Sequence, residues 1–328
     1  MLDFAQRQAH NQRCSAALVV FFIMVFLVIG GAVDYLYLDG FSSAGAPFPI
    51  ATVFALSFAT FTTLTAYYGG GGLILGSLGA EKPDIQIPEH RELRNIVTEM
   101  ALASGSAMPQ VYVIYDPAPN ALATGTNDKN AAICVTTGLL TLLDREETQG
   151  VVAHEMSHIR NEDILLMTLV SILLGGIAIL ADFGQRGFYS TRSGRRVGQK
   201  YPLIFLPLIL LIALSPVIGR LLAMAVSRQR EYLADASAAQ YTRNPRGLAR
   251  ALEKIRDSGI PFQKASRGTA HLFFTNPLRR RLDDSESGLA NLLSTHPPID
   301  RRIALLYEMA GMPRPMVRSF MGLSPEQR

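Results

Sequence analysis

The stretch His154-Glu155-Met156-Ser157-His158 places two histidines four positions apart, with a glutamate directly after the first. On a helix, side chains at positions i and i+4 lie on one face, so both imidazoles can bind a single ion. Neutral imidazole suits Zn²⁺, and a catalytic zinc keeps one coordination position for water. Zinc lowers the pKa of such a water to about 7, and Glu155 can then accept its proton. The motif therefore predicts zinc-dependent hydrolysis with Glu155 as the general base.

Two histidines leave this metal site incomplete, because a catalytic zinc is usually held by three protein ligands. The best candidate for the third is Glu231, which forms a second i and i+4 pair with Asp235 on an expected helix. Asp235 would then accept a hydrogen bond from the ring N–H of a ligand histidine, an arrangement common around zinc. The spacing alone leaves three rivals for the third ligand, which are His271, His296 and Asp163.

The segments around the motif predict a mainly α-helical domain with a small β-sheet, an α+β fold. Apolar residues three and four positions apart predict helices, and alternating apolar residues predict strands. The expected helices span residues 88–104, 138–143, 145–161, 227–241 and 244–257. The expected strands span residues 110–115 and 131–136. The histidine motif thus lies on a helix that ends directly before an apolar run.

Four apolar stretches are long enough to cross a membrane, which takes about 20 mostly apolar residues in a helix. They are residues 17–38, 50–78, 164–181 and 201–226. The chain contains 48% hydrophobic and 18% charged residues, whereas soluble domains carry about 25% charged residues. This composition favours a helical membrane anchor of about four segments and excludes a disordered chain. Two cysteines exclude a disulfide-built secreted scaffold, and a net charge of +4 does not indicate a nucleic-acid partner.

The apolar stretches divide the expected soluble domain into two pieces. Residues 1–80 contain the first two membrane segments, and residues 164–226 form a membrane hairpin. Residues 81–163 are the first part of the catalytic domain, and residues 227–312 are the second part, which carries the candidate third ligand. Acidic residues outnumber basic ones in the first part and the reverse holds in the second, which is compatible with docking of the two. Residues 313–328 are expected to be a loose tail.

Basic residues set the expected orientation, because cytoplasmic loops of membrane proteins are enriched in Lys and Arg. Arg7 and Arg13 precede the first segment, and the loop after that segment contains neither Lys nor Arg. The N-terminus and residues 81–163 are therefore expected in the cytoplasm. The basic loop 182–200 breaks this rule, unless the hairpin 164–226 enters the membrane without crossing it. A cleaved signal peptide in place of the first segment would leave this orientation unchanged.

Four motifs in a fixed order resemble the HtpX-type membrane zinc endopeptidases, which are related to the CAAX prenyl proteases. The first is residues 120–125, Asn-Ala-Leu-Ala-Thr-Gly, and the second is the His-Glu-x-x-His motif between apolar segments. The third is the Arg-x-x-Glu-x-x-Ala-Asp pattern of residues 228–235, and the fourth is Ser-Thr-His-Pro-Pro at 294–298. The resemblance extends from the second apolar segment to about Tyr307.

This resemblance implies a zincin-like metalloprotease domain with one zinc ion per chain. His154 and His158 match the first two zinc ligands of the family, and Glu231 matches the third. Glu155 matches the general base, and Asp235 matches the carboxylate that orients a ligand histidine. The cofactor expected for the chain is therefore Zn²⁺.

The resemblance also implies roles for residues around the metal. Arg228 matches an arginine that fixes the ligand helix. His296 matches a residue that stabilises the tetrahedral intermediate, and Arg302 is expected to assist it; the alternative for His296 is packing at a helix start. An edge strand that pairs with extended substrate is expected at Asn120, Ala121, Leu122 and Ala123. The alternative for this segment is a loop that packs on the site.

The function expected from these features is that of a multi-pass, membrane-anchored zinc endopeptidase whose site faces the cytoplasm at the inner (cytoplasmic) membrane. Its partners would be the lipid bilayer and polypeptide substrates, chiefly damaged or misfolded membrane proteins, as in quality control during stress. One alternative is processing of a specific membrane or lipidated substrate. A second alternative is a non-catalytic membrane scaffold with a structural metal. Transport is disfavoured, because the charged motifs lie outside the apolar runs.

Overall fold

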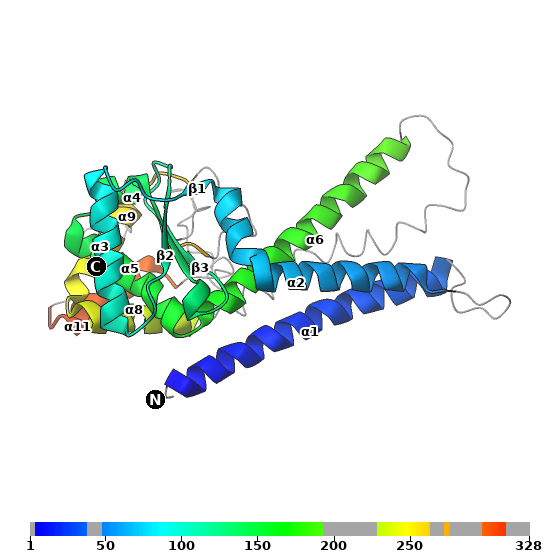
Figure 1. Cartoon of the computed structure of the whole chain (residues 1–328), viewed down its shortest axis with the longest axis horizontal. Helices are drawn as coiled ribbons and strands as arrows, with labels where there is room; N and C mark the ends of the chain where they lie inside the picture. Colours follow the sequence, from blue (N-terminus) through cyan, green and yellow to red (C-terminus); the bar gives the residue numbers. More distant parts are fainter. Residues whose placement is uncertain (1–3, 38–47, 193–227, 263–271, 276–296, 313–328) are drawn as a thin grey trace, which may run out of the picture.

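The structure is a computed structural model that describes residues 4–37, 48–192, 228–262, 272–275 and 297–312. Long helices α1 (Phe4–Tyr37), α2 (Ile50–Leu78) and α6 (Asp163–Arg192) extend away from a domain in which shorter helices surround a sheet (Figure 1). Several predictions fall outside the described residues. They concern the segment 201–226, residues 193–200 of the basic loop 182–200, the tail 313–328, the side chain of Arg228, and both His271 and His296. The first part of that expected loop, residues 182–192, is instead helical and belongs to α6.

The shorter helices form where apolar residues recur at helical spacing between residues that favour helix ends. They are α3 (Pro88–Ser104), α4 (Thr137–Leu142), α5 (Arg145–Arg160), α8 (Arg228–Thr242), α9 (Pro245–Ser258) and α11 (Ile299–Met309). Helices α3 and α9 begin with proline, whose fixed φ suits the first turn. Both end at a glycine in the left-handed region, Gly105 and Gly259. The helices predicted near the histidine motif are confirmed.

The sheet has four strands in the order β1-β2-β4-β3. They are β1 (Ala80–Glu81), β2 (Gln110–Ile114), β3 (Ala121–Thr124) and β4 (Ala132–Thr136). Strands β2 and β4 are parallel, and β3 pairs antiparallel with β4 in a register that sets Leu122 opposite Cys134. The two predicted strands are confirmed as β2 and β4. Strand β3 lies at one end of the sheet, and a 3₁₀ turn, η1 (Asp128–Asn130), connects it to β4.

Helix α5 carries the histidine motif and packs against β3, α3, α8 and α9. A capping box starts it: Asp144 accepts from the N–H of Glu147 at 2.9 Å, and the Glu147 carboxylate accepts from the N–H of Asp144 at 2.9 Å. A Cβ at Gly150 would lie 2.8 Å from the backbone nitrogen of Leu248, so α9 packs directly on the backbone of α5. The motif side chains are therefore held on a rigid, enclosed helix.

Among the described residues, two helices are long and apolar enough to cross a membrane, not the four segments expected. They are Gln8–Tyr35 within α1 and Ile50–Leu78, which is α2. The third expected segment, residues 164–181, forms part of α6, and its described side chains up to Ile177 pack with α1 and α2 in one apolar cluster. The fourth, residues 201–226, lies outside the described residues. Helix α1 also begins earlier than the first apolar segment, because the residues before that segment contain no helix breaker.

The hairpin of α1 and α2 is closed by a buried carboxylate near the end of α1. Asp34 accepts hydrogen bonds from the backbone N–H groups of Ala51 at 3.0 Å and Thr52 at 2.7 Å. The Thr52 hydroxyl donates to the same carboxylate at 2.6 Å. The first N–H groups of a helix have no partner within the helix. Asp34 supplies that partner for α2 and fixes the register of the two helices.

Helices α2 and α6 cross closely at the glycine run of α2. A Cβ at Gly70 would lie 2.7 Å from Cγ2 of Thr168 in α6. The Thr168 hydroxyl lies 3.1 Å from the Thr124 hydroxyl at the end of β3 and accepts from the N–H of Gly125 at 3.2 Å. The long helices are therefore attached directly to the edge strand of the domain.

Candidate metal centre

Two histidines of α5 and one glutamate of α8 converge inside the domain. Their possible ligand atoms all lie within 4.8 Å of one another, and all three residues are buried. The Nε2 atoms of His154 and His158 are 3.2 Å apart. Carboxylate oxygens of Glu231 lie 3.8 Å from Nε2 of His154 and 3.7 Å from Nε2 of His158. The structure thus brings together the three residues expected to be zinc ligands.

Each histidine is oriented by a carboxylate that contacts Nδ1, whereas its Nε2 is the ring nitrogen at the converging site. Nδ1 of His154 lies 2.9 Å from Oδ1 of Asp235, and Nδ1 of His158 lies 3.1 Å from Oδ2 of Asp163. Because an ionised carboxylate only accepts hydrogen bonds, each Nδ1 carries the hydrogen. The Nε2 lone pairs are then directed toward each other and toward Glu231. Two imidazoles and a carboxylate, with the histidines held in this tautomer, fit a catalytic zinc ion.

Arg302 of α11 is fully enclosed behind these residues. Its guanidinium donates to both oxygens of Asp235, from Nε at 2.8 Å and from Nη2 at 2.8 Å. Nη1 donates to the carbonyl oxygen of Phe274 at 3.2 Å and lies 3.7 Å from Oε2 of Glu231. These contacts favour a role in holding Asp235 in place, rather than the expected assistance to a tetrahedral intermediate.

The two histidines differ in their affinity for protons. Burial lowers the pKa of His154 to about 4, and the positive charge of Arg302 also lowers it. The hydrogen bond that His154 donates to Asp235 acts in the opposite direction. Burial also disfavours the charged form of His158, but the hydrogen bond with Asp163 and the charge of Glu231 outweigh it and raise its pKa to about 9. Without a metal ion, His154 is therefore neutral at neutral pH, whereas His158 carries a second ring proton and is positively charged.

Glu155 lies on the same helix, adjacent to the edge strand. Burial raises the pKa of its carboxyl to about 7, and the negative charge of Glu231 adds to this effect. The positive charges of His158 and Arg302 and a hydrogen bond from the backbone N–H of Ala123 act in the opposite direction. The carboxyl is thus directed toward β3 and has a pKa close to neutral pH.

The residues expected to form a substrate strand lie in β3 and directly before it. One side of β3 pairs with β4, and its other side meets the short segment 272–275. The N–H of Phe274 donates to the carbonyl oxygen of Ala121 at 2.8 Å. The Asn120 side chain donates to the carbonyl of Thr275 at 3.0 Å and accepts from its N–H at 3.2 Å. An antiparallel bridge pairs Leu122 with Phe273, so this segment covers the outer edge from Asn120 to Leu122.

Two residues have contacts that the sequence reasoning did not predict. Asp163 was a rival third ligand, but it bonds to the far nitrogen of His158. Its position just after the motif helix was a usable signal, because a carboxylate there can reach a ligand histidine of the last turn. Phe274 packs edge-on against His154, with ring centroids 4.9 Å apart. No sequence pattern indicated that contact.

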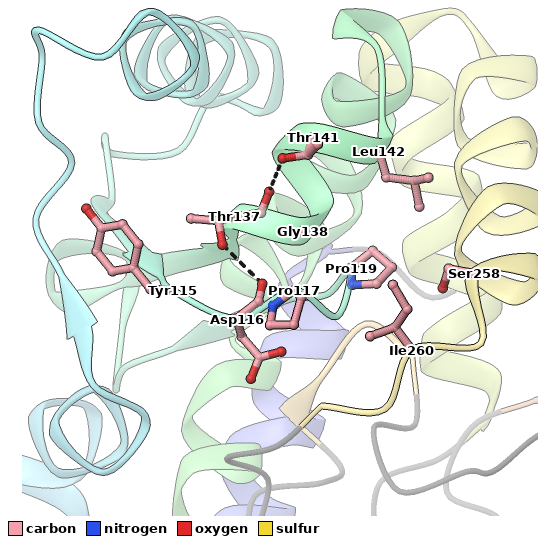
Figure 2. A pocket seen from close by; sticks show the side chains of 10 residues that line it. All are labelled: Tyr115, Asp116, Pro117, Pro119, Thr137, Gly138, Thr141, Leu142, Ser258 and Ile260. Carbon is pink, nitrogen blue, oxygen red and sulfur yellow. Dashed lines mark hydrogen bonds between the residues drawn. The ribbon is translucent and has the colours of Figure 1, made fainter.

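A separate cavity of about 540 Å³ lies between the loop after β2, α4 and the end of α9 (Figure 2). Its lining includes Tyr115, Pro117, Pro119 and Ile260. The hydroxyl of Thr137 donates to the carbonyl of Asp116 at its wall, as Figure 2 shows. None of the three converging ligands lines this cavity. The metal centre is thus a buried cluster distinct from this hollow.

Comparison with known proteins gives three findings. Residues 88–310 match the family described as Peptidase family M48. A protein of Caldanaerobacter subterraneus subsp. tengcongensis described as "Protease HtpX homolog" is 41% identical over 304 residues, which cover 91% of this chain and 95% of that protein. One of Dictyoglomus thermophilum with the same description is 39% identical and covers 92% of this chain and 93% of its own. The crystal structure of S. mikatae Ste24p matches with a TM-score of 0.48 and 20% identity, covering 85% of this chain and 63% of that chain.

Proposed function

The chain belongs to peptidase family M48, where it groups with the HtpX-type proteases, and from this premise we propose how its buried centre works. It is a membrane metalloprotease, a hydrolase of polypeptides, whose family implies a metal that is generally zinc. We propose that one zinc ion per chain binds to His154, His158 and Glu231. The observation that carries the proposal is the convergence of these buried ligand atoms within 4.8 Å.

Glu155 is the proposed general base. Zinc bound at such a site lowers the pKa of a water molecule and polarises a carbonyl group. Glu155 takes the proton of the attacking water and returns a proton to the departing amine. Only the ionised carboxyl can accept that proton, and a zinc ion at this site would favour the ionised form, because a nearby positive charge lowers the pKa of a carboxyl group. The hydrogen bond from the N–H of Ala123 orients it toward the strand proposed to bind substrate.

The proposed substrate site is the outer edge of β3, with residues Asn120, Ala121, Leu122 and Ala123. An extended peptide can add to a sheet edge through backbone hydrogen bonds. The segment 272–275 already pairs with Ala121 and Leu122, so substrate is proposed to pair first at the Ala123 end, next to Glu155. Pairing with the rest of this edge would require displacement of that segment. His296 remains the proposed residue for stabilising the tetrahedral intermediate, and Arg228 the proposed support of the ligand helix.

Residues 81–163 and 227–312 are proposed to form one catalytic domain. Helix α5 of the first piece carries His154 and His158, and helix α8 of the second carries Glu231. The packing of α5 against α8 supports a single domain. Residues 1–80 and 164–226 form the proposed anchor, with the domain on the cytoplasmic face of the inner membrane. The proposed role is quality control of damaged or misfolded membrane proteins, and the attachment of the long helices to β3 supports it because the site stays close to the bilayer.

Replacing the proposed base separates metal binding from catalysis. The change Glu155→Gln keeps the size of the side chain but removes its ability to accept a proton. We expect the purified variant to retain zinc and to lose cleavage of an unfolded reporter protein by at least about 100-fold. Zinc content is measured by metal analysis and cleavage by gel assay. Cleavage at the wild-type rate would refute the base assignment.

Two further variants serve as comparisons for that experiment. Glu146→Gln changes an exposed glutamate on the same helix, which pairs with Arg250 at the surface, and should retain both zinc and activity. Glu231→Ala should lose both, since two histidines alone hold zinc weakly. Zinc bound to Glu231→Ala with wild-type affinity would place the third ligand elsewhere.

A further inference from the structure

Three side-chain amides of α1 donate hydrogen bonds to the end of α5 and the turn after it. The second and third lie three and four residues after the first, so both share a helix face with it. The donors are Gln8, Asn11 and Gln12. Gln8 donates to the carbonyl oxygen of Arg160 at 3.0 Å. The last carbonyl groups of a helix have no hydrogen-bond partner within that helix, so α1 provides donors that cap the C-terminal end of α5.

Asn11 does more than cap the helix. It is buried, and its Nδ2 donates to the carbonyl oxygen of Asn161 at 2.8 Å and to Oδ1 of Asp163 at 2.6 Å. A side-chain amide carries two hydrogens on its nitrogen. Both partners only accept, so both hydrogens are used and the amide has a single orientation.

Asp163 links this amide to the metal centre. Its second oxygen, Oδ2, lies 3.1 Å from Nδ1 of His158, and Arg230 is more distant, with Nη1 at 3.7 Å from Oδ1. The residue before it, Glu162, has a φ of +58°, so the turn that carries Asp163 has a left-handed residue. The side-chain contact with Asn11 therefore fixes a carboxylate that follows a sharp turn.

We propose that Asn11 is a positioning residue for the metal centre: it holds Asp163 so that the carboxylate orients His158 toward the metal. The proposal rests on the proposed function, because it assumes that His158 is a ligand. It makes the first membrane helix part of the support of the catalytic site. A residue that only capped α5 would stabilise the fold without changing the affinity for zinc.

Gln8 provides the matched control, because it caps the same helix from the same face without contacting Asp163. We would purify the full chain in detergent and measure its zinc affinity by competition with a chromophoric chelator. Loss of a partner behind a ligand histidine costs about 10- to 100-fold in metal affinity. We expect about a tenfold weaker affinity for Asn11→Ala, up to about 100-fold for Asp163→Ala, and no change for Gln8→Ala.

The double variant tests whether Asn11 acts through Asp163. If it does, Asn11→Ala adds no further loss of zinc affinity in an Asp163→Ala background. The visible absorption of bound Co²⁺ is a second readout, and we expect a changed spectrum for Asn11→Ala but not for Gln8→Ala. Additive losses, or an unchanged spectrum, would overturn the proposal.

Three further results of these zinc measurements would each contradict part of the proposal. Equal zinc affinity of Asn11→Ala and Gln8→Ala means that Asn11 is only a cap. If Asn11→Ala does not fold, Asn11→Leu keeps the size of the side chain and removes both donors, and wild-type affinity in that variant refutes the proposal. A wild-type chain that binds no zinc refutes the proposed function itself, so the two failures are distinguishable.

Discussion

Each histidine of the candidate metal centre is held by a carboxylate that is itself held from a distant part of the chain. His154 bonds to Asp235, which Arg302 of α11 fixes from both oxygens. His158 bonds to Asp163, which receives the amide of Asn11 from α1. A buried carboxylate stays ionised only where donors compensate for its lost hydration. The two supports therefore keep both imidazoles in the tautomer that a metal needs.

Zinc affinity is expected to depend on pH through His158. Its pKa of about 9 means that the ring is charged at neutral pH when no metal is bound, and zinc must displace that proton. The affinity should therefore rise about tenfold per pH unit from about pH 7 to about pH 9 and then level off. His154, with a pKa of about 4, adds nothing in this range.

Calorimetry in buffers of different ionisation enthalpy checks this dependence. One proton should be released for each zinc bound near pH 7.5, by the same linkage. The Asp163→Ala variant is the comparison, because loss of its hydrogen bond lowers the pKa of His158 and reduces the number of protons released. An affinity that does not change between about pH 7 and pH 8.5 would contradict the expectation.

The local part of this centre could be predicted from sequence and the tertiary part could not. The spacing of His154 and His158 fixes their common face on a helix, whatever the rest of the fold. Glu231 needed the resemblance to rise above its rivals, since spacing says nothing about distance across the chain. Asp163 and Arg302 were given other roles, because a carboxylate or guanidinium can face either side of a ligand histidine.

At the scale of elements, close approach of α9 to α5 depends on Gly150. A Cβ there would lie 2.8 Å from the backbone nitrogen of Leu248 and 2.9 Å from its Cα. Backbone cannot move aside as a side chain does, so Gly150→Ala should lower the free energy of unfolding by about 1–3 kcal/mol. Thermal unfolding in detergent measures this loss.

Gly76→Ala is the control for that substitution. No atom lies within 4 Å of a Cβ at Gly76, which is also helical, and alanine has the higher helix propensity. We expect its melting temperature to be unchanged or slightly raised. If Gly150→Ala melts like Gly76→Ala, the contact between α5 and α9 tolerates more displacement than its geometry indicates.

Elements with a regular apolar pattern were predictable, and those without one were not. Helix α3 matches its expected range because apolar and polar residues alternate at helical spacing. Strand β3 is buried at all four positions, so it shows no alternation, and only the resemblance indicated it. Helix α1 extends to Phe4, beyond its apolar part, since hydropathy does not detect a polar helix.

At the scale of the whole molecule, the contacts of α1 define sides of the membrane. The start of α1 bonds to the end of α5, and the end of α2 leads into β1, so both helices begin or finish at the catalytic domain (Figure 1). We therefore expect position 10 and this domain to lie on the same side of the membrane. Phe48, between the two helices, lies at their far end.

Cysteine labelling in sealed vesicles tests this arrangement. In a Cys14→Ser background, an impermeant thiol reagent should label cysteines at His10 and Glu146 from the same side, and a cysteine at Phe48 from the opposite side. Cys134 is buried and should not react. All three positions are exposed, so differences in labelling report sidedness. Labelling of position 48 together with position 146 would exclude a membrane-crossing hairpin.

The number of membrane helices was the weakest prediction at this scale. Hydropathy alone cannot distinguish an apolar helix that faces lipid from one that packs on other helices. In the described part of α6, Leu166, Leu169 and Leu173 are buried in a cluster that also contains side chains of α1 and α2, so one apolar face of each helix packs on the other helices. The composition did predict a membrane protein, and the sequence family and the two apolar helices bear that out.

The pairing of Arg302 with Asp235 has a consequence for biosynthesis. A ribosome makes α11 after every ligand of the centre, so a nascent chain contains the histidines and Glu231 before it contains that guanidinium. A buried carboxylate left without its cation costs several kcal/mol. The centre therefore reaches its final arrangement only after α11 has been synthesised, later than both histidines and Glu231.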